Sequence, residues 1–184
     1  VYYFEAEPFH PFYRATSAGA TYPSMGISNV ALTWGTQAHG QLNYLDFVIT
    51  FTRNDINGLV LEIPVVSEDG TKIYNNPTLM GIQSGGKYPC SVGVYSAIYC
   101  FYVQGSATNY GSPTRIFASG FTIPGNNSLS LRMLFTNPDI PEVFPKFTFR
   151  AFGGSYSPPD LMGSELRGLY ELVEPFKVYS SNVN

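Results

Sequence analysis

The fold is decided by residues 43–65, which read NYLDFVITFTRNDINGLVLEIPV. Apolar side chains occupy every second position on both sides of a polar centre: Leu45, Phe47, Ile49 and Phe51 before it, and Leu59, Leu61, Ile63 and Val65 after it. This alternation is typical of β-strands with one buried face. The centre, residues 54–58, ends in Asn57-Gly58, and an Asn-Gly pair favours a tight hairpin turn. We therefore expect residues 43–53 and 59–65 to be paired strands of one hairpin.

The same alternation recurs along the chain at intervals of about 8–12 residues, as in β-sandwiches. In residues 28–36, Val30, Leu32 and Trp34 share one face, and we expect Trp34 in the core. Further strands are expected at residues 88–95, 97–104, 115–123, 129–135, 147–151 and 170–178. The helix candidate is residues 160–174, although its two glycines disfavour helix, and we expect only a short helical turn before the last strand. The chain thus predicts an all-β domain of about eight or nine strands over residues 15–184.

Charge and composition exclude several other classes of protein. Lys and Arg number 10 against 13 Asp and Glu, a net charge of −3, and no basic cluster offers a nucleic-acid surface. Charged residues are 12% of the chain, about half of the roughly 25% that is typical. The 18 Gly and 14 Pro disfavour coiled coils and helical bundles. No apolar run reaches the length of a membrane-spanning helix, so we expect no membrane span.

Two features indicate an extracellular or cell-surface protein. Cys90 and Cys100 lie on neighbouring expected strands, where a hairpin can bring them to disulfide distance. The alternative is a pair of free buried thiols. Asn126 begins an Asn-Asn-Ser glycosylation sequon beside a Pro-Gly pair that favours an exposed loop.

The sequence offers little for catalysis or metal binding. Its only histidines, His10 and His39, are far apart, so we expect no metal site and no cofactor. Residues 55–58 resemble part of a calcium loop but are expected to be a turn, because the downstream Glu ligand is missing. Residues 153–157 read GGSYS and depart from the nucleophile elbow at the last position. Glu62 is the acid within an apolar strand, and we expect it to face outward because its neighbours share the opposite face. We expect no enzyme activity.

The amino-terminal segment, residues 1–14, reads VYYFEAEPFHPFYR and is rich in aromatic side chains. Its prolines confine it to an edge strand or an extended arm, since proline cannot donate to a strand ladder. We expect the arm to add to a sheet edge of a neighbouring copy, which gives a heterologous contact that closes into a ring or grows into a fibre. The alternative is an arm packed on its own domain. The expected interface residues are Tyr2, Tyr3, Phe4, Phe9 and Phe12.

In strand spacing, in the turn at residues 54–58, in the Cys90/Cys100 hairpin and in the aromatic arm, the chain resembles Ig-like fibre subunits of the pilus type. It also resembles the tandem β-sandwich modules of secreted surface proteins. The resemblance implies an antiparallel Ig-like sandwich whose subunits exchange strands, with a structural role in a filament or surface layer. The local cysteine pair departs from that class, in which the usual disulfide joins more distant strands.

The rival hypothesis is a secreted carbohydrate-binding module that uses exposed aromatic side chains. Sugar-binding sites commonly present an aromatic ring as a flat platform. The candidates for such a platform are Tyr22, Trp34, Tyr44, Tyr110 and Tyr156. The expected partners are therefore copies of the same chain and, under this rival hypothesis, glycans.

Overall fold

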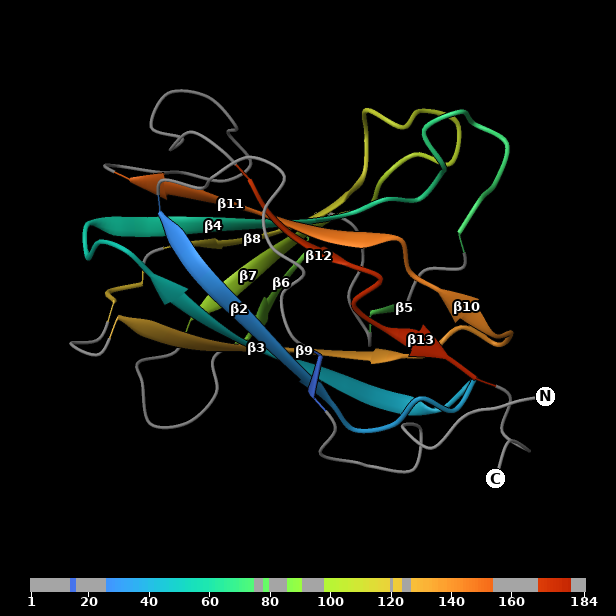
Figure 1. The fold of residues 1–184 in the computed structure, drawn as a ribbon, viewed down its shortest axis with the longest axis horizontal. Coiled ribbons are helices and arrows are strands. Elements are labelled where there is room, and N and C mark those ends of the chain that lie inside the picture. Colours follow the sequence, from blue (N-terminus) through green and yellow to red (C-terminus); the bar gives the residue numbers. More distant parts are fainter. Residues whose placement is uncertain are drawn as a thin grey trace.

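The computed structural model is built from β-strands that form two stacked antiparallel sheets (Figure 1). It describes residues 14–15, 26–74, 78–79, 86–90, 98–119, 121–123, 127–153 and 169–179. In chain order the strands are β1 (Arg14–Ala15), β2 (Ile27–Trp34), β3 (Leu42–Phe51), β4 (Ile56–Ile63), β5 (Thr78–Leu79), β6 (Lys87–Pro89), β7 (Tyr99–Val103), β8 (Thr114–Ser119), β9 (Ser128–Thr136), β10 (Glu142–Val143), β11 (Lys146–Gly153), β12 (Tyr170–Val173) and β13 (Lys177–Val178).

Part of the strand order in each sheet matches that of an immunoglobulin domain. The five-stranded sheet has the order β1-β2-β3-β9-β5, and the six-stranded sheet has the order β12-β11-β4-β8-β7-β6. Within them, β2-β3-β9 and β12-β11-β4 occupy the places of strands A-B-E and G-F-C of immunoglobulin domains. A separate two-stranded sheet pairs β10 with β13. The prediction of an all-β antiparallel sandwich is confirmed, and its longer strands are the eight labelled β2, β3, β4, β7, β8, β9, β11 and β12.

The hairpin predicted between residues 43–53 and 59–65 is wrong. β3 pairs with β2 and β9, whereas β4 pairs with β8 and β11 in the other sheet. Asn57 and Gly58 lie inside β4, and neither has the positive φ that a tight Asn-Gly turn requires. The chain instead crosses between the sheets at residues 52–55. This crossing lets the apolar faces of β3 and β4 face each other across one core. In a flat hairpin, the two strands would instead lie side by side in one sheet.

Aromatic rings from both sheets fill the core. The inward side chains of β3 are at most 3% exposed, as the alternation predicts. Phe47 meets Phe147 and Phe149 edge to face, at ring-centroid distances of 6.0 and 5.5 Å. Trp34 is buried and packs edge to face on Phe176 at 5.3 Å, which confirms its expected place in the core. These edge-to-face contacts add to the hydrophobic burial that holds the sheets together.

The last strand expected at residues 170–178 is present as two short strands, β12 and β13, so the end of the helix candidate 160–174 is strand, as expected. Tyr170–Val173 forms β12, which pairs antiparallel with residues 146–149 of β11. Tyr170 and Leu172 point into the core, so the strand alternation outweighs helix propensity here. Residues 160–168 lie outside the described residues.

A disulfide joins Cys90, directly after β6, to Cys100 in β7, with their Cα atoms 5.8 Å apart. Both cysteines are buried, and Tyr88 pairs with Cys100 across the hairpin. The Cys90 carbonyl also accepts a hydrogen bond of 2.8 Å from the backbone N–H of Arg132 in β9. The bridged hairpin therefore connects the two sheets at one side of the sandwich. The disulfide pair predicted from the sequence is present.

We predict that the double variant Cys90→Ala/Cys100→Ala lowers the free energy of unfolding by about 3 kcal/mol, because the bridge restricts a short loop in the unfolded chain. Urea denaturation of the variant and the parent, followed by fluorescence, measures the difference. An unchanged transition midpoint would show that the bridge contributes nothing to stability.

Candidate functional site

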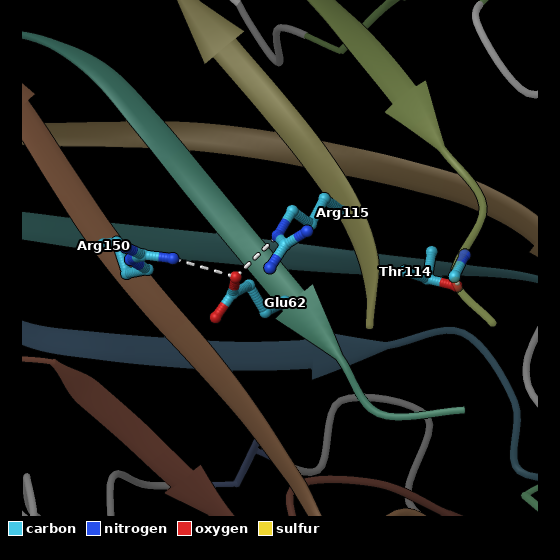
Figure 2. A network of polar contacts seen from close by, with 5 residues as sticks. Glu62, Thr114, Arg115 and Arg150 are labelled. Atoms are coloured by element: carbon cyan, nitrogen blue, oxygen red, sulfur yellow. Dashed lines mark hydrogen bonds and ion pairs between the residues drawn. The ribbon is translucent and has the colours of Figure 1, made fainter. Parts of the chain in front are cut away.

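The outer face of the six-stranded sheet carries a row of charged and polar side chains. Glu62 in β4 lies opposite Arg115 in β8 on one side and opposite Thr148 in β11 on the other. Its neighbours Leu61 and Ile63 point into the core, so Glu62 faces outward as predicted. Figure 2 shows Arg115 and Arg150 approaching the Glu62 carboxylate from the strands on either side.

Glu62 receives two guanidinium groups at one oxygen. Arg115 Nε donates to Glu62 Oε2 at 2.7 Å, and Arg150 Nη1 donates to the same oxygen at 3.0 Å. The three side chains are only 15–22% exposed, so solvent screens their attraction weakly. Charge-assisted hydrogen bonds of this kind are stronger than neutral ones. The trio therefore fixes the orientation of both arginines.

Beside this trio, Lys146 links β11 to β12 and to a loop. Its Nζ lies 3.3 Å from Glu171 Oε2 and 5.8 Å from the centre of the Tyr110 ring. Burial lowers the pKa of Lys146, but Tyr110 and Glu171 outweigh burial, so its pKa lies above the ordinary value. Lys146 is therefore a cation at neutral pH.

The loop that carries Tyr110 is anchored at the start of β8. Gly105 N–H donates to Thr114 Oγ1 at 3.0 Å. Thr114 directly precedes Arg115 of the charged trio in β8, and both are labelled in Figure 2. A Cβ atom on Gly105 would lie 2.4 Å from backbone atoms of Pro113 and Thr114, so only glycine permits this close approach. The anchored loop sets the position of Tyr110.

Together these side chains line a cavity of about 210 Å³, which we call the Tyr110 cavity. Three cations and two carboxylates face it, which leaves a charge of 3 − 2 = +1. Its lining consists of Glu62, Pro64, Tyr110, Gly111, Pro113, Arg115, Lys146, Thr148, Arg150, Leu169 and Glu171. The cavity thus offers hydrogen-bond donors, acceptors and an aromatic ring to a small polar molecule.

The same outer face becomes apolar one row further along the strands. Val60, Phe117 and Phe152 form a second buried cluster, against which Phe101 and Val103 pack. This cluster was not predicted. Its sequence signal is the run Leu59-Val60-Leu61, in which both faces of the strand are apolar.

The outer face of the five-stranded sheet is different, because apolar side chains are exposed on it. Val48 is 38% exposed and Leu134 is 52% exposed, and both lie among serines and threonines of β3 and β9. Arg132 bonds Asp46 through Nε and Nη2, both at 2.7 Å, and covers the Tyr44 ring at 4.4 Å. Apart from the Arg132–Asp46 pair, the outward side chains of β3 and β9 on this face are uncharged.

Among the described residues, only the short strand β1 pairs with the outer edge of β2. Arg14 pairs with Thr33 and Ala15 with Leu32, and β1 ends there. Arg14, predicted as the last residue of the arm, therefore belongs to the sheet. Among the residues that the structure describes, no strand pairs with this edge at Ser28–Ala31.

The residues that the sequence proposes as interface, glycosylation or sugar-platform sites, together with His10, fall into three groups. The first lies outside the described residues: Tyr2, Tyr3, Phe4, Phe9, His10, Phe12, Tyr22, Asn126 and Tyr156. The second group is Trp34, which is buried, and Tyr44, which is half-buried with Arg132 over its ring. The third is Tyr110, which lines the Tyr110 cavity. Trp34, Tyr44 and Tyr110 do not form one common platform, since they lie in the core, on the five-stranded sheet and beside the six-stranded sheet.

We predict that Glu62→Gln lowers the free energy of unfolding by about 2 kcal/mol, because two half-buried guanidinium groups lose their shared carboxylate. Asp55→Asn is the matched control, since the Arg53–Asp55 pair is exposed to solvent, and it should change stability much less. Urea denaturation of both variants gives the comparison. Equal losses would contradict a structural role for the trio.

The described residues bring together no group of three or more His, Cys, Asp or Glu side chains that could hold a metal ion. They also contain no helix with the length and hydropathy of a membrane span. Comparison of the chain with protein-family models, with curated proteins and with solved structures gave no match.

Proposed function

We propose that this chain is a structural, non-enzymatic module of an extracellular assembly, in which the aromatic arm of one copy adds to the β2 edge of the next. One observation carries the proposal: β1 occupies the edge of β2 only at Leu32 and Thr33, and the described residues leave the Ser28–Ala31 stretch open. An open edge of this kind is a template for another strand.

The register of β1 bears on which residues could pair with Ser28–Ala31. In an antiparallel ladder, the positions before Arg14 correspond to positions after Thr33. Extending β1 backward along the chain therefore leads past Trp34, away from Ser28–Ala31. A strand formed by residues 1–13 reaches Ser28–Ala31 more directly when it comes from a neighbouring copy.

The surface beside this edge suits an aromatic donor. Ala31 lies opposite the exposed Val48 on the outer face of the sheet. An added strand would place every second side chain on that face, next to Ala31 and Val48. Tyr2 and Phe4 alternate in this way, and burial of their rings would add hydrophobic stabilisation to the backbone hydrogen bonds.

The disulfide supports the extracellular part of the proposal. Structural disulfides persist in oxidising compartments and are rare in the cytosol. The buried Cys90–Cys100 bridge fits such a setting. The bridge also stabilises an extracellular subunit, because it restricts the conformations of the unfolded chain.

We predict that deletion of residues 1–13 leaves a folded monomer, whereas the full chain forms larger assemblies. The shortened chain keeps β1 and the sandwich, so its circular dichroism and urea midpoint should match those of the full chain. Light scattering after size-exclusion chromatography measures the assembly, and a peptide of residues 1–13 should bind the shortened chain. Assembly of the shortened chain at the same concentration would overturn the proposal.

A pair of substitutions on the acceptor sharpens the test. Val48→Lys places a charge next to Ala31, over which the rings of the proposed donor strand would lie, and should raise the concentration needed for assembly by about tenfold. Leu134→Lys is the control, because Leu134 is also exposed on this sheet face but lies in β9, two strands away from β2. If both variants weaken assembly equally, the contact is made by the sheet face and not by the β2 edge.

A further inference from the structure

We propose that the Tyr110 cavity binds a single sugar ring that carries a carboxylate, that is, a uronic-acid type of monosaccharide. This proposal is independent of assembly, because the cavity lies over the six-stranded sheet and the proposed acceptor edge belongs to the five-stranded sheet. It assigns a binding function to residues that the strand-addition proposal does not use.

The size of the cavity limits the ligand to a small molecule. Its volume of about 210 Å³ is below the roughly 300–1,000 Å³ of sites for drug-sized ligands. One six-membered ring with its substituents is suited to this space, whereas an oligosaccharide would have to extend into solvent.

The charge of the cavity selects a singly charged anion. Arg115, Lys146 and Arg150 outnumber the two carboxylates by one, although the whole chain has a net charge of −3. A carboxylate makes the occupied cavity neutral. A doubly charged phosphate would leave it negative, beside Glu62 and Glu171.

Arg115 supplies the carboxylate contact. A guanidinium group has five N–H donors in a planar fork, and Glu62 takes the Nε donor of Arg115 at 2.7 Å. The structure assigns its terminal nitrogens no partner among the described residues. Because Glu62 fixes the guanidinium plane, these nitrogens can bind both oxygens of a carboxylate at little entropic cost.

Tyr110, Thr148 and Glu171 supply contacts for the rest of the sugar. The Tyr110 ring offers a flat apolar surface, and the C–H face of a pyranose ring can pack against it. The Thr148 hydroxyl can donate or accept a hydrogen bond, and the Glu171 carboxylate accepts hydrogen bonds from hydroxyl groups. These groups distinguish a sugar acid from a simple carboxylate such as acetate.

Titration of the full chain with glucuronate, glucose, acetate and phosphate, monitored by NMR chemical shifts, tests the proposal. We expect saturable binding of glucuronate, with shifts at Tyr110 and Arg115, and at least about tenfold weaker binding of the other three compounds. Phosphate binding as tight as glucuronate binding would overturn the sugar-acid assignment. Absence of saturable glucuronate shifts would overturn the site itself.

Three variants locate the ligand. Arg115→Gln should weaken glucuronate binding by about tenfold or more, because it removes the carboxylate contact. Arg132→Gln is the matched control, since Arg132 also pairs with a carboxylate but lies on the other sheet, and it should bind glucuronate normally. Tyr110→Ser, in a surface loop, should also weaken glucuronate binding, because it removes the ring contact and keeps the charged trio. Equal affinity of Arg115→Gln, Tyr110→Ser and Arg132→Gln would contradict the proposed site.

Discussion

The packing of two apolar sheet faces against each other is the interaction on which the rest of this structure depends. Phe47 of one sheet contacts Phe147 and Phe149 of the other, and Trp34 contacts Phe176. Burial of such rings contributes several kcal/mol each relative to exposure. Because alternate residues face this core, the remaining residues of each strand define the two outer faces. The core thus determines which side chains are available for function.

The two outer faces have different chemical characters. On the six-stranded sheet, Glu62 and its two arginines lie between a polar cavity and a buried apolar cluster. On the five-stranded sheet, exposed Val48 and Leu134 lie among small hydroxyl side chains. The first face suits recognition of a small charged molecule, and the second suits coverage by another polypeptide. The two contacts that we propose, with a sugar acid and with a neighbouring copy, therefore involve different sheets and would not compete.

Local patterns in the sequence predicted the local properties of this fold. The alternation at Leu45–Phe51 predicted β3 and its buried face, and the same reasoning placed Trp34 in the core and turned Glu62 outward. The pairing of strands was harder to predict, because Asn57-Gly58 fits a turn as well as a strand interior. Only the gain from joining two apolar faces in one core decides between these arrangements, and that gain depends on strands far away in the chain.

The Tyr110 cavity could not be predicted for the same reason. Glu62 is 53 residues from Arg115 and 88 residues from Arg150, and only the registers of β8 and β11 against β4 bring them together. A single sequence contains no signal for such registers. The disulfide was predictable because its two cysteines belong to one short hairpin.

The claim that a second copy completes the β2 edge is tested most directly by hydrogen exchange measured on dilute and concentrated samples of the full chain. Amide hydrogens between Ser28 and Ala31 that do not bond to β3 should exchange more slowly in the concentrated sample, since an added strand would accept their hydrogen bonds. Amides in the centre of β3 should exchange equally in both samples. Identical exchange at Ser28–Ala31 in the two samples, under conditions where the chain assembles, would contradict the account.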